Sequence, residues 1–277
     1  MRVSLLQLNS SEDPSHNVRV MRSMLDDAVA DGAGFALLPE VANCLGANRK
    51  RQMEVLQPEA TDPTLAALRE EAARHGIWLL IGSLALKTDD PDGRFANRSI
   101  LISPEGEIAA RYDKLHMFDV QLSETEQYQE SQGYRPGTEA VIAKTPFATI
   151  GLSICYDLRF PYLYRSLAQA GAEILTVPAA FSYATGPGHW EPLLRARAIE
   201  CGAWVLAPAQ TGQHGEGNGA LRRTHGHSLI VSPWGEVMGD AGTAPGVLSV
   251  ELDMASVSQA RQKIPALQHD REFIGPE

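Results

Sequence analysis

Short aliphatic runs alternate with longer amphipathic stretches along the whole chain. Runs of mostly apolar residues predict buried strands, and apolar residues at three- and four-residue spacing predict helices. The stretch 14–30 shows the helical pattern, because Met21, Leu25 and Ala28 share one face. The predicted strands are 3–8, 34–38, 77–84, 97–103, 107–111, 149–155, 173–177, 203–207, 226–231 and 246–251, and the predicted helices are 14–30, 63–75, 161–171, 188–201 and 254–263.

Two pairs of segments repeat along the chain. Residues 76–83 resemble 202–209, and residues 99–108 resemble 228–237, each of the latter pair holding a Ser-Pro-x-Gly turn between two strands. The repeat predicts two similar halves, each a sheet covered by helices, although the two hairpins could also have arisen independently. Stacked sheet on sheet, such halves form an α/β fold, a four-layer α-β-β-α sandwich. No Ser/Gly-rich linker divides the chain, so we expect one domain over 1–277.

Composition and charge narrow the class of protein. The 277 residues are 44% hydrophobic, enough for a substantial core, but no apolar run approaches the roughly 20 residues that span a bilayer. A formal net charge of −10 argues against nucleic acid as a partner, because no basic stripe is available for phosphates. Three cysteines and the absence of an apolar leader predict a soluble, cytoplasmic protein without disulfides.

One predicted strand ends in a cysteine, in the run Ile-Gly-Leu-Ser-Ile-Cys155-Tyr-Asp-Leu-Arg-Phe-Pro. A thiol at a strand-to-helix turn can face a cleft, and the dipoles of the following helix favour the thiolate, which is the reactive form. Alternatively, Cys155 is a small apolar residue that finishes a core strand. A catalytic role therefore needs partners elsewhere in the chain.

Two other segments end in an ionisable residue in the same way. Phe-Ala-Leu-Leu-Pro-Glu40 places a carboxylate where α/β folds form their ligand clefts, and burial there predicts a raised pKa that suits a base. Lys114 follows the first Ser-Pro-x-Gly hairpin, where an inward-pointing ammonium would lower the pKa of a thiol and stabilise an oxyanion. Taken singly, a solvated loop glutamate and a surface lysine are the commoner interpretations.

Taken together, Leu-Pro-Glu40, Tyr-Asp-Lys114-Leu-His and Ile-Cys155-Tyr-Asp-Leu-Arg-Phe-Pro resemble the Glu-Lys-Cys signature of the nitrilase (carbon–nitrogen hydrolase) superfamily. The resemblance extends over essentially the whole chain, from Gln7 to the Pro-Trp-Gly hairpin at Pro233. It implies the four-layer sandwich, usually paired as a homodimer or higher homo-oligomer. It also implies a cysteine-dependent hydrolase of linear amides that uses no metal and no organic cofactor.

The resemblance also implies a role for each site residue. Cys155 is the nucleophile, Glu40 is its general base and later acid, and Lys114 stabilises the tetrahedral intermediate together with the backbone N–H of Tyr156. Glu130, in Tyr-Gln-Glu-Ser, matches a second glutamate that orders the lysine and the substrate. In the implied reaction the thiolate attacks an amide carbonyl, ammonia leaves, and water releases a carboxylic acid from the thioester.

Within the superfamily, the Thr-Gly-Pro-Gly-His-Trp-Glu and Arg-Ala-Arg-Ala-Ile-Glu segments resemble the Nit amidase branch. This implies deaminated glutathione as the small-molecule substrate, with 2-oxoglutaramate, the substrate of ω-amidase, as the alternative. For such acidic amides we expect a cationic lining from Arg159, Arg195 and Arg197, with Phe181 as a wall, unless these residues serve ion pairs and the core. The glycine-rich loop 213–220 is either a mobile lid over the cleft or a surface excursion.

Three other interpretations are weaker. His225 and His227 alternate on a predicted strand as metal ligands do, but no carboxylate or cysteine cluster accompanies them. His116, His189 or His214 could pair with the cysteine as in a protease, which would leave the glutamate and lysine unexplained. A catalytically silent binding protein is a different class, and the intact Glu-Lys-Cys set argues against it.

Overall fold

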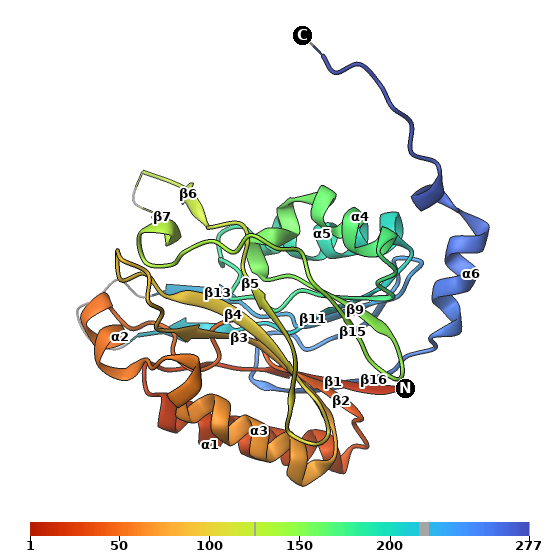
Figure 1. The fold of residues 1–277 in the computed structure, drawn as a ribbon. Coiled ribbons are helices and arrows are strands. Elements are labelled where there is room, and N and C mark those ends of the chain that lie inside the picture. Colours follow the sequence, from red (N-terminus) through yellow and green to blue (C-terminus); the bar gives the residue numbers. More distant parts are fainter. Residues whose placement is uncertain (125, 216–221, 277) are drawn as a thin grey trace.

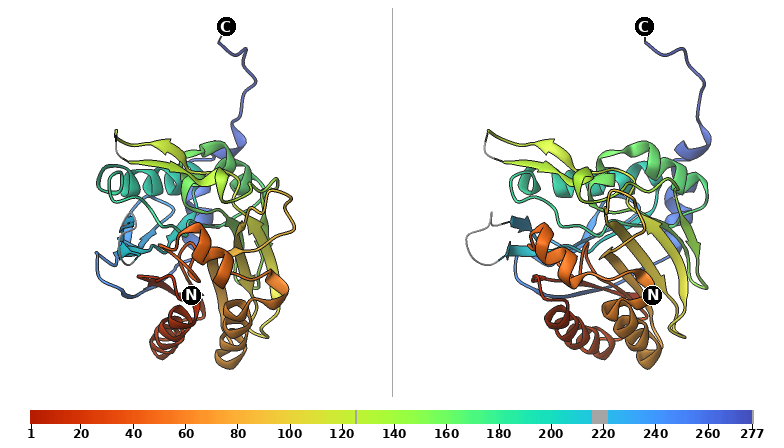
Figure 2. Two further views of the ribbon diagram at one scale, coloured as in Figure 1. Left: turned by 90° about the vertical axis from the view of Figure 1, so that its left-hand side faces the viewer. Right: turned by 60° about the vertical axis from the view of Figure 1, so that its left-hand side comes forward.

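The computed structural model describes residues 1–124, 126–215 and 222–276. Two six-stranded sheets lie face to face, with α1 (Pro14–Ala30) and α3 (Pro63–His75) outside the first and α4 (Pro161–Gln169) and α5 (Gly186–Cys201) outside the second (Figure 1 and Figure 2). The predicted α-β-β-α sandwich is thereby confirmed. None of the helices within the described ranges has the length and apolar character needed to cross a membrane.

The remaining elements complete the two sheets and their surroundings. The first sheet runs in the order β16 (Gly246–Glu251), β1 (Arg2–Gln7), β2 (Phe35–Leu37), β3 (Trp78–Leu86), β4 (Ala96–Ile102) and β5 (Ile108–Asp113). The second runs in the order β15 (Val237–Asp240), β14 (Leu229–Val231), β11 (Trp204–Ala207), β10 (Ile174–Thr176), β9 (Thr149–Leu152) and β8 (Ile142–Lys144). Outside them lie α2 (Arg49–Val55), α6 (Ala255–Lys263) and two small antiparallel pairs, β6 (Asp119–Gln121) with β7 (Gln127–Gln129) and β12 (Thr211–His214) with β13 (Arg222–His225).

The two sheets have the same topology, in agreement with the repeat in the sequence. Each has three parallel central strands, β1-β2-β3 or β9-β10-β11, followed by an antiparallel hairpin on one side and flanked by an antiparallel edge strand on the other. The matching Ser-Pro-x-Gly turns use Gly106 and Gly235 at φ +79° and +85°, a left-handed conformation that glycine adopts without strain.

Every predicted strand and helix is present, with ends that differ by up to three residues. Several short elements were not predicted. Helix α2 has no buried residue, so it carries no apolar periodicity, and β6 and β7 are three-residue strands without a fully buried position. Pattern reading detects an element only through the face that it buries.

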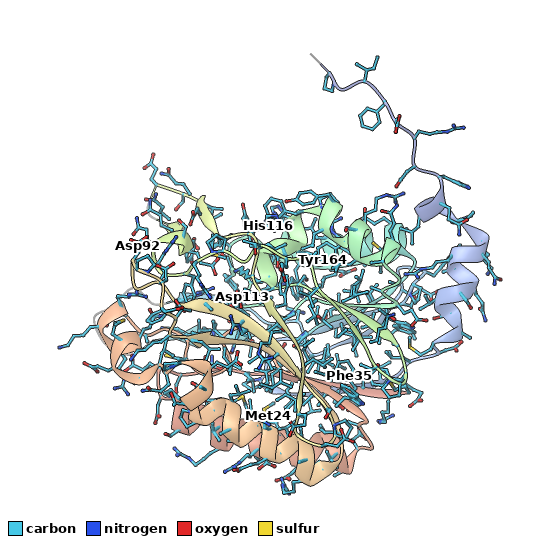
Figure 3. The ribbon with its side chains drawn as sticks, in the orientation of Figure 1. Met24, Phe35, Asp92, Asp113, His116 and Tyr164 are labelled. Atoms are coloured by element: carbon cyan, nitrogen blue, oxygen red, sulfur yellow. The ribbon has the colours of Figure 1, made fainter. Side chains whose placement is uncertain are left out.

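Alternation along β1 explains how one strand serves two layers. Val3 and Leu5 face the second sheet, whereas Leu6 packs with Leu25 and Leu68 of the outer helices. Side chains fill the space between the sheets and beneath the helices, with Met24 on the helical side and Phe35 between the sheets (Figure 3). The sandwich therefore has separate apolar layers rather than one central cluster.

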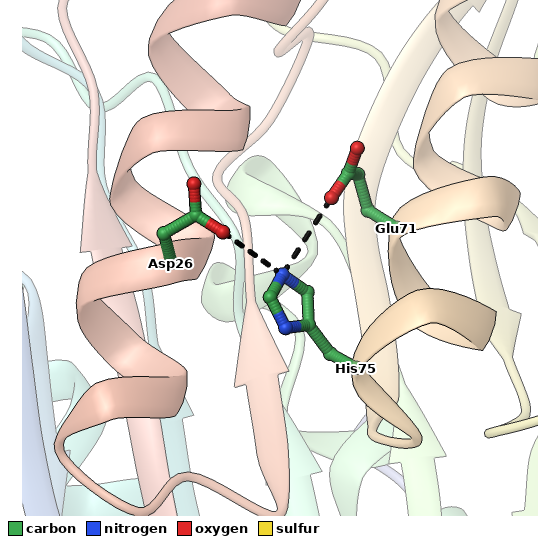
Figure 4. Close-up of side chains that lie close together, drawn as sticks. All are labelled: Asp26, Glu71 and His75. Atoms are coloured by element: carbon green, nitrogen blue, oxygen red, sulfur yellow. Dashed lines mark ion pairs between the residues drawn. The ribbon is translucent and has the colours of Figure 1, made fainter.

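An ion-pair cluster joins α1 to α3. The Nε2 atom of His75 lies 3.2 Å from Asp26 and 3.6 Å from Glu71 (Figure 4). The three potential ligand atoms lie within 4.8 Å of one another, a spacing that a metal ion could use. However, Arg74 already contacts the same two carboxylate oxygens, and Arg22 pairs with Glu71 at 2.8 Å. The cluster is therefore an inter-helix salt-bridge network.

Gly82 is the point where the loops after β2 and β10 approach β3. A Cβ atom there would lie 1.9 Å from the carbonyl oxygen of Leu38, 2.6 Å from that of Pro39 and 2.5 Å from Cβ of Pro178. Only a residue without a side chain allows the loops after β2 and β10 to come this close.

We therefore predict that Gly82→Ala destabilises the protein by about 1–3 kcal/mol or more, because the clash involves backbone atoms that cannot rotate away. Urea unfolding followed by circular dichroism measures the difference. Gly34→Ala is the matched control, since a Cβ there meets nothing within 4 Å, and it should leave stability almost unchanged. Equal stability of the two variants would contradict this account of the loop packing.

Candidate active site

The predicted residues meet in one cavity of about 320 Å³. Glu40 follows β2, Lys114 follows β5 directly, and Cys155 lies three residues beyond β9, so both sheets contribute. Glu130 begins a short 3₁₀ turn after β7. All four side chains line the cavity, as do Tyr156 and Phe181. Carboxyl ends of parallel strands converge at one edge, which explains why residues so distant in sequence meet here.

The backbone at Cys155 differs from the strand-to-helix turn that the sequence predicted. Strand β9 ends at Leu152, and Cys155 opens a 3₁₀ turn, Cys155–Arg159, that precedes α4. Its φ of +49° is rare for a residue with a side chain, and its N–H donates to the carbonyl of Pro178 at 2.9 Å. The thiol is therefore not at the N-terminus of an α-helix, and the expected acidification by helix dipoles is wrong.

Burial dominates the ionisation of this thiol. Removal from water raises the pKa of Cys155 well above its ordinary value, the nearby Glu40 carboxylate raises it further, and the Lys114 ammonium opposes both. The lysine does favour the thiolate, as expected, but it does not outweigh burial. Burial therefore favours the neutral thiol over the thiolate, which is the reactive form of a cysteine.

Glu40 is held as a carboxylate by three donors. Lys114 Nζ and Asn97 Nδ2 donate to Oε1 at 2.8 and 2.9 Å, and the N–H of Ala180 donates to Oε2 at 2.8 Å. Burial alone would raise the pKa of Glu40, but the adjacent ammonium and these hydrogen bonds hold it below its usual range. The expected rise in this pKa is wrong, because the sequence revealed the burial but not the donors.

Lys114 lies between two carboxylates. Its Nζ is 2.9 Å from both oxygens of Glu130 and 2.8 Å from Oε1 of Glu40, and the side chain is 2% exposed. Burial alone would lower the pKa of Lys114, yet the two carboxylates raise it well above its ordinary value. The backbone N–H of Phe118 donates to Glu130 at 2.6 Å and fixes that carboxylate in turn.

A third buried carboxylate joins the lysine segment to the cysteine segment. Asp157 accepts from the hydroxyl of Tyr112 at 2.6 Å, from Nδ1 of His116 at 2.7 Å and from the N–H of Ile154 at 2.8 Å. Tyr112 and His116 flank Lys114, and Ile154 immediately precedes the thiol. Tyr112, His116 and Asp157, the neighbours of Lys114 and Cys155 in the two motifs, therefore set the relative position of the ammonium and the sulfur.

The expected arginine lining differs from the observed one. Arg197 is buried and donates to the carbonyl of Leu158, and Arg195 donates to that of Gly235, so both serve structural contacts away from the cavity. Arg159 lies farther out, with its guanidinium 5.6 Å from the ring of Phe181.

Two residues that sequence reasoning missed line the cavity instead. Asn97 Nδ2 bridges Glu40 and Glu130, while its Oδ1 is buried without a hydrogen-bond partner among the described residues. Arg222, the first residue of β13, donates to the carbonyl of Ala180 at 3.0 Å. The sequence held one signal for Asn97, since an asparagine in a mostly apolar strand is unusual. Arg222 adjoins the glycine-rich loop, of which 216–220 lies outside the described residues.

Histidines do not line this cavity within the part of the chain that the structure describes. His116 pairs with Asp157, His189 with Arg159, and His214 is buried with its pKa lowered to about 4 by desolvation. His225 and His227 stack on each other at 4.6 Å in a different region. Among the described residues, the cavity therefore holds carboxylates and no imidazole near the thiol.

The chain is similar to known proteins over nearly its whole length. The family model described as carbon-nitrogen hydrolase matches residues 2–262. The chain is 39% identical over 270 residues to a protein of Yersinia enterocolitica and 41% identical over 271 residues to one of Synechocystis, both named deaminated glutathione amidase. These matches cover 97% of the chain and 92% and 97% of the two relatives.

A solved structure shares the fold. The NitFhit protein of C. elegans superposes with a TM-score of 0.89 at 34% identity. The match covers 98% of this chain but 65% of the longer worm chain.

Glu40→Gln should shift the pH dependence of Cys155 alkylation to lower pH. The carboxylate is one of the groups that raise the pKa of this thiol, and its removal leaves Lys114 to stabilise the thiolate. The rate of labelling by iodoacetamide, followed by peptide mass spectrometry from pH 6 to 10, measures the shift.

Two controls accompany this measurement. Glu54→Gln removes an exposed carboxylate and should leave the profile unchanged. Cys44 and Cys201 are buried with pKa values raised to about 12 by burial, so they should stay unlabelled in the folded protein. A profile that moves to higher pH in Glu40→Gln would contradict the assigned electrostatics.

Proposed function

The chain belongs to the carbon–nitrogen hydrolase family, and we propose that it hydrolyses the amide bond of deaminated glutathione through a thioester on Cys155. The observation that carries this proposal is the cavity in which an ionised carboxylate lies beside a neutral thiol and a buried ammonium. Relatives of 39% and 41% identity bear the name of this activity.

In the first half-reaction Glu40 takes the proton of the Cys155 thiol as sulfur attacks the amide carbon. Lys114 Nζ and the backbone N–H of Tyr156 stabilise the resulting oxyanion. Glu40 then gives its proton to the departing amine as the C–N bond breaks, which leaves a thioester. Glu130 keeps the ammonium in place while Glu40 is transiently neutral, because it pairs with the same nitrogen at 2.9 Å.

In the second half-reaction Glu40 takes a proton from water, whose oxygen attacks the thioester carbon. The carboxylic acid leaves, and sulfur recovers its proton from Glu40. The cycle converts one amide and one water into a carboxylic acid and an amine, so the proposed mechanism includes no step for a metal or an organic cofactor.

The substrate determines which amine departs. In deaminated glutathione the nitrogen of the scissile amide belongs to cysteinylglycine, so this dipeptide leaves together with 2-oxoglutarate. Ammonia leaves only from primary amides such as 2-oxoglutaramate, the alternative substrate, which carries the same acyl group. Measuring 2-oxoglutarate therefore covers both substrates.

We further propose that the chain, as one catalytic domain over 1–277, pairs as a homodimer in the cytoplasm. Ile199, Trp234 and Ile264 are 57%, 52% and 59% exposed, and they line one hollow formed by the end of α5, the β14–β15 turn and α6. A patch of this kind is typical of an interface between subunits. Beyond α6 the tail extends away from the body with Phe273 exposed (Figure 1).

The substrate proposal predicts that deaminated glutathione has the largest kcat/KM in a panel with 2-oxoglutaramate and simple aliphatic amides. Release of 2-oxoglutarate or ammonia is the readout, and Cys155→Ala should abolish turnover of every amide. A higher kcat/KM for 2-oxoglutaramate would move the assignment to ω-amidase. Turnover of none, with a folded protein, would favour the silent binding protein.

The assembly proposal predicts a wild-type dimer by size-exclusion chromatography with light scattering. Trp234→Asp should shift it toward monomer, because a charge replaces an exposed ring in the apolar hollow. Met53→Asp, which adds the same charge to an exposed methionine on α2, is the control. A monomeric wild-type protein at micromolar concentration would exclude the proposed dimer.

A further inference from the structure

The charges that line the catalytic cavity leave one cation available. Among the described residues they are the carboxylates of Glu40 and Glu130 and the cations of Lys114 and Arg222. The charge of Lys114 is already paired, because its ammonium lies 2.8–2.9 Å from both carboxylates. Without Arg222 these three groups carry a net negative charge, which would repel an anionic substrate.

The Arg222 guanidinium has N–H donors that make no hydrogen bond among the described residues. Its Nη2 donates to the carbonyl of Ala180 at 3.0 Å, and its guanidinium lies 5.9 Å from the ring centre of Tyr128. No carboxylate of the described residues forms an ion pair with it. A guanidinium has five N–H donors, so most of them remain for a ligand in the cavity.

The same short segment connects Arg222 with the base. The carbonyl of Ala180 accepts from Arg222, and its N–H donates to Oε2 of Glu40 at 2.8 Å. The guanidinium is thus fixed relative to the group that handles the proton. A ligand carboxylate bound by Arg222 would therefore lie in the same cavity as Cys155 and Glu40.

We propose that Arg222 binds the carboxylate on the acyl side of the substrate and thereby selects acidic amides over neutral ones. This inference rests on the proposed amidase function. Deaminated glutathione carries one carboxylate on its acyl chain and a second on the glycine of the departing dipeptide. The acyl carboxylate fits the position beside Ala180, and it stays in place through the thioester stage, so the same contact serves both half-reactions.

The sequence prediction placed this role on Arg159, Arg195 and Arg197, and the structure assigns it to a residue beside the glycine-rich loop instead. Arg195 and Arg197 donate to backbone carbonyls elsewhere, and Arg159, which contacts His189 and the ring of Phe181, does not line the cavity. Arg222 is unlike them because it lines the cavity.

Arg222→Gln tests the inference through a specificity ratio. We expect the ratio of kcat/KM for 2-oxoglutaramate over that for neutral pentanamide to fall about 10- to 100-fold, the effect of losing a hydrogen bond to a charged group. The loss should appear mainly in KM, and Arg222→Lys should recover part of it. Arg223→Gln is the matched control, since its side chain points to the opposite face of β13, over Tyr183, and should leave the ratio unchanged.

Two outcomes would overturn the inference. An equal loss on 2-oxoglutaramate and pentanamide would mean that Arg222 acts only through the Ala180 segment. A loss confined to deaminated glutathione would mean that Arg222 recognises the departing dipeptide.

A binding measurement separates this inference from the proposed function. If the wild-type enzyme hydrolyses none of these amides, the amidase assignment fails. Calorimetric titration of the inactive Cys155→Ala protein with 2-oxoglutarate then still decides the role of Arg222. Binding at least tenfold weaker in Cys155→Ala/Arg222→Gln supports the carboxylate site, and unchanged affinity overturns it.

Discussion

The buried ammonium of Lys114 between Glu40 and Glu130 is the interaction on which the site depends. Charges withdrawn from water are tolerated only when each has a close partner, and removal of one partner costs about 3–5 kcal/mol. The lysine follows β5, one glutamate follows β2, and the other begins the turn after β7. The three side chains can pair only if the segments that follow β5, β2 and β7 meet at one point.

The triad also divides the chemistry between sulfur and oxygen. Burial raises the pKa of the Cys155 thiol, while the Lys114 ammonium lowers the pKa of Glu40 and keeps it ionised. A carboxylate with a low pKa is a weak base in water. In the proposed mechanism, its closeness to the thiol and the oxyanion donors compensate for this difference in pKa, because they stabilise the transition state more than the resting enzyme.

Rigid packing around the triad keeps these groups in register. Asp157 joins the backbone before the thiol to the residues that flank the lysine, and it is fully buried. Gly82 lets the loops that carry Glu40 and Pro178 come together, and Pro178 in turn accepts from the N–H of Cys155. The left-handed backbone at the cysteine persists because these contacts over-determine it.

The sequence by itself determined the layers, the presence of the main strands and helices and the Glu-Lys-Cys motifs, because buried faces leave a periodic pattern and each motif is local. It could not determine α2 or the exposed strands, which bury no face. Nor could it determine the lowered pKa of Glu40, since this depends on Lys114 and the N–H of Ala180, which come from other parts of the chain, or the raised pKa of Cys155, which depends first on its burial. Only the tertiary structure brought Arg222 into the cavity and turned Arg197 away from it. A sequence shows which side chains are charged, but the fold decides which group each charged side chain contacts.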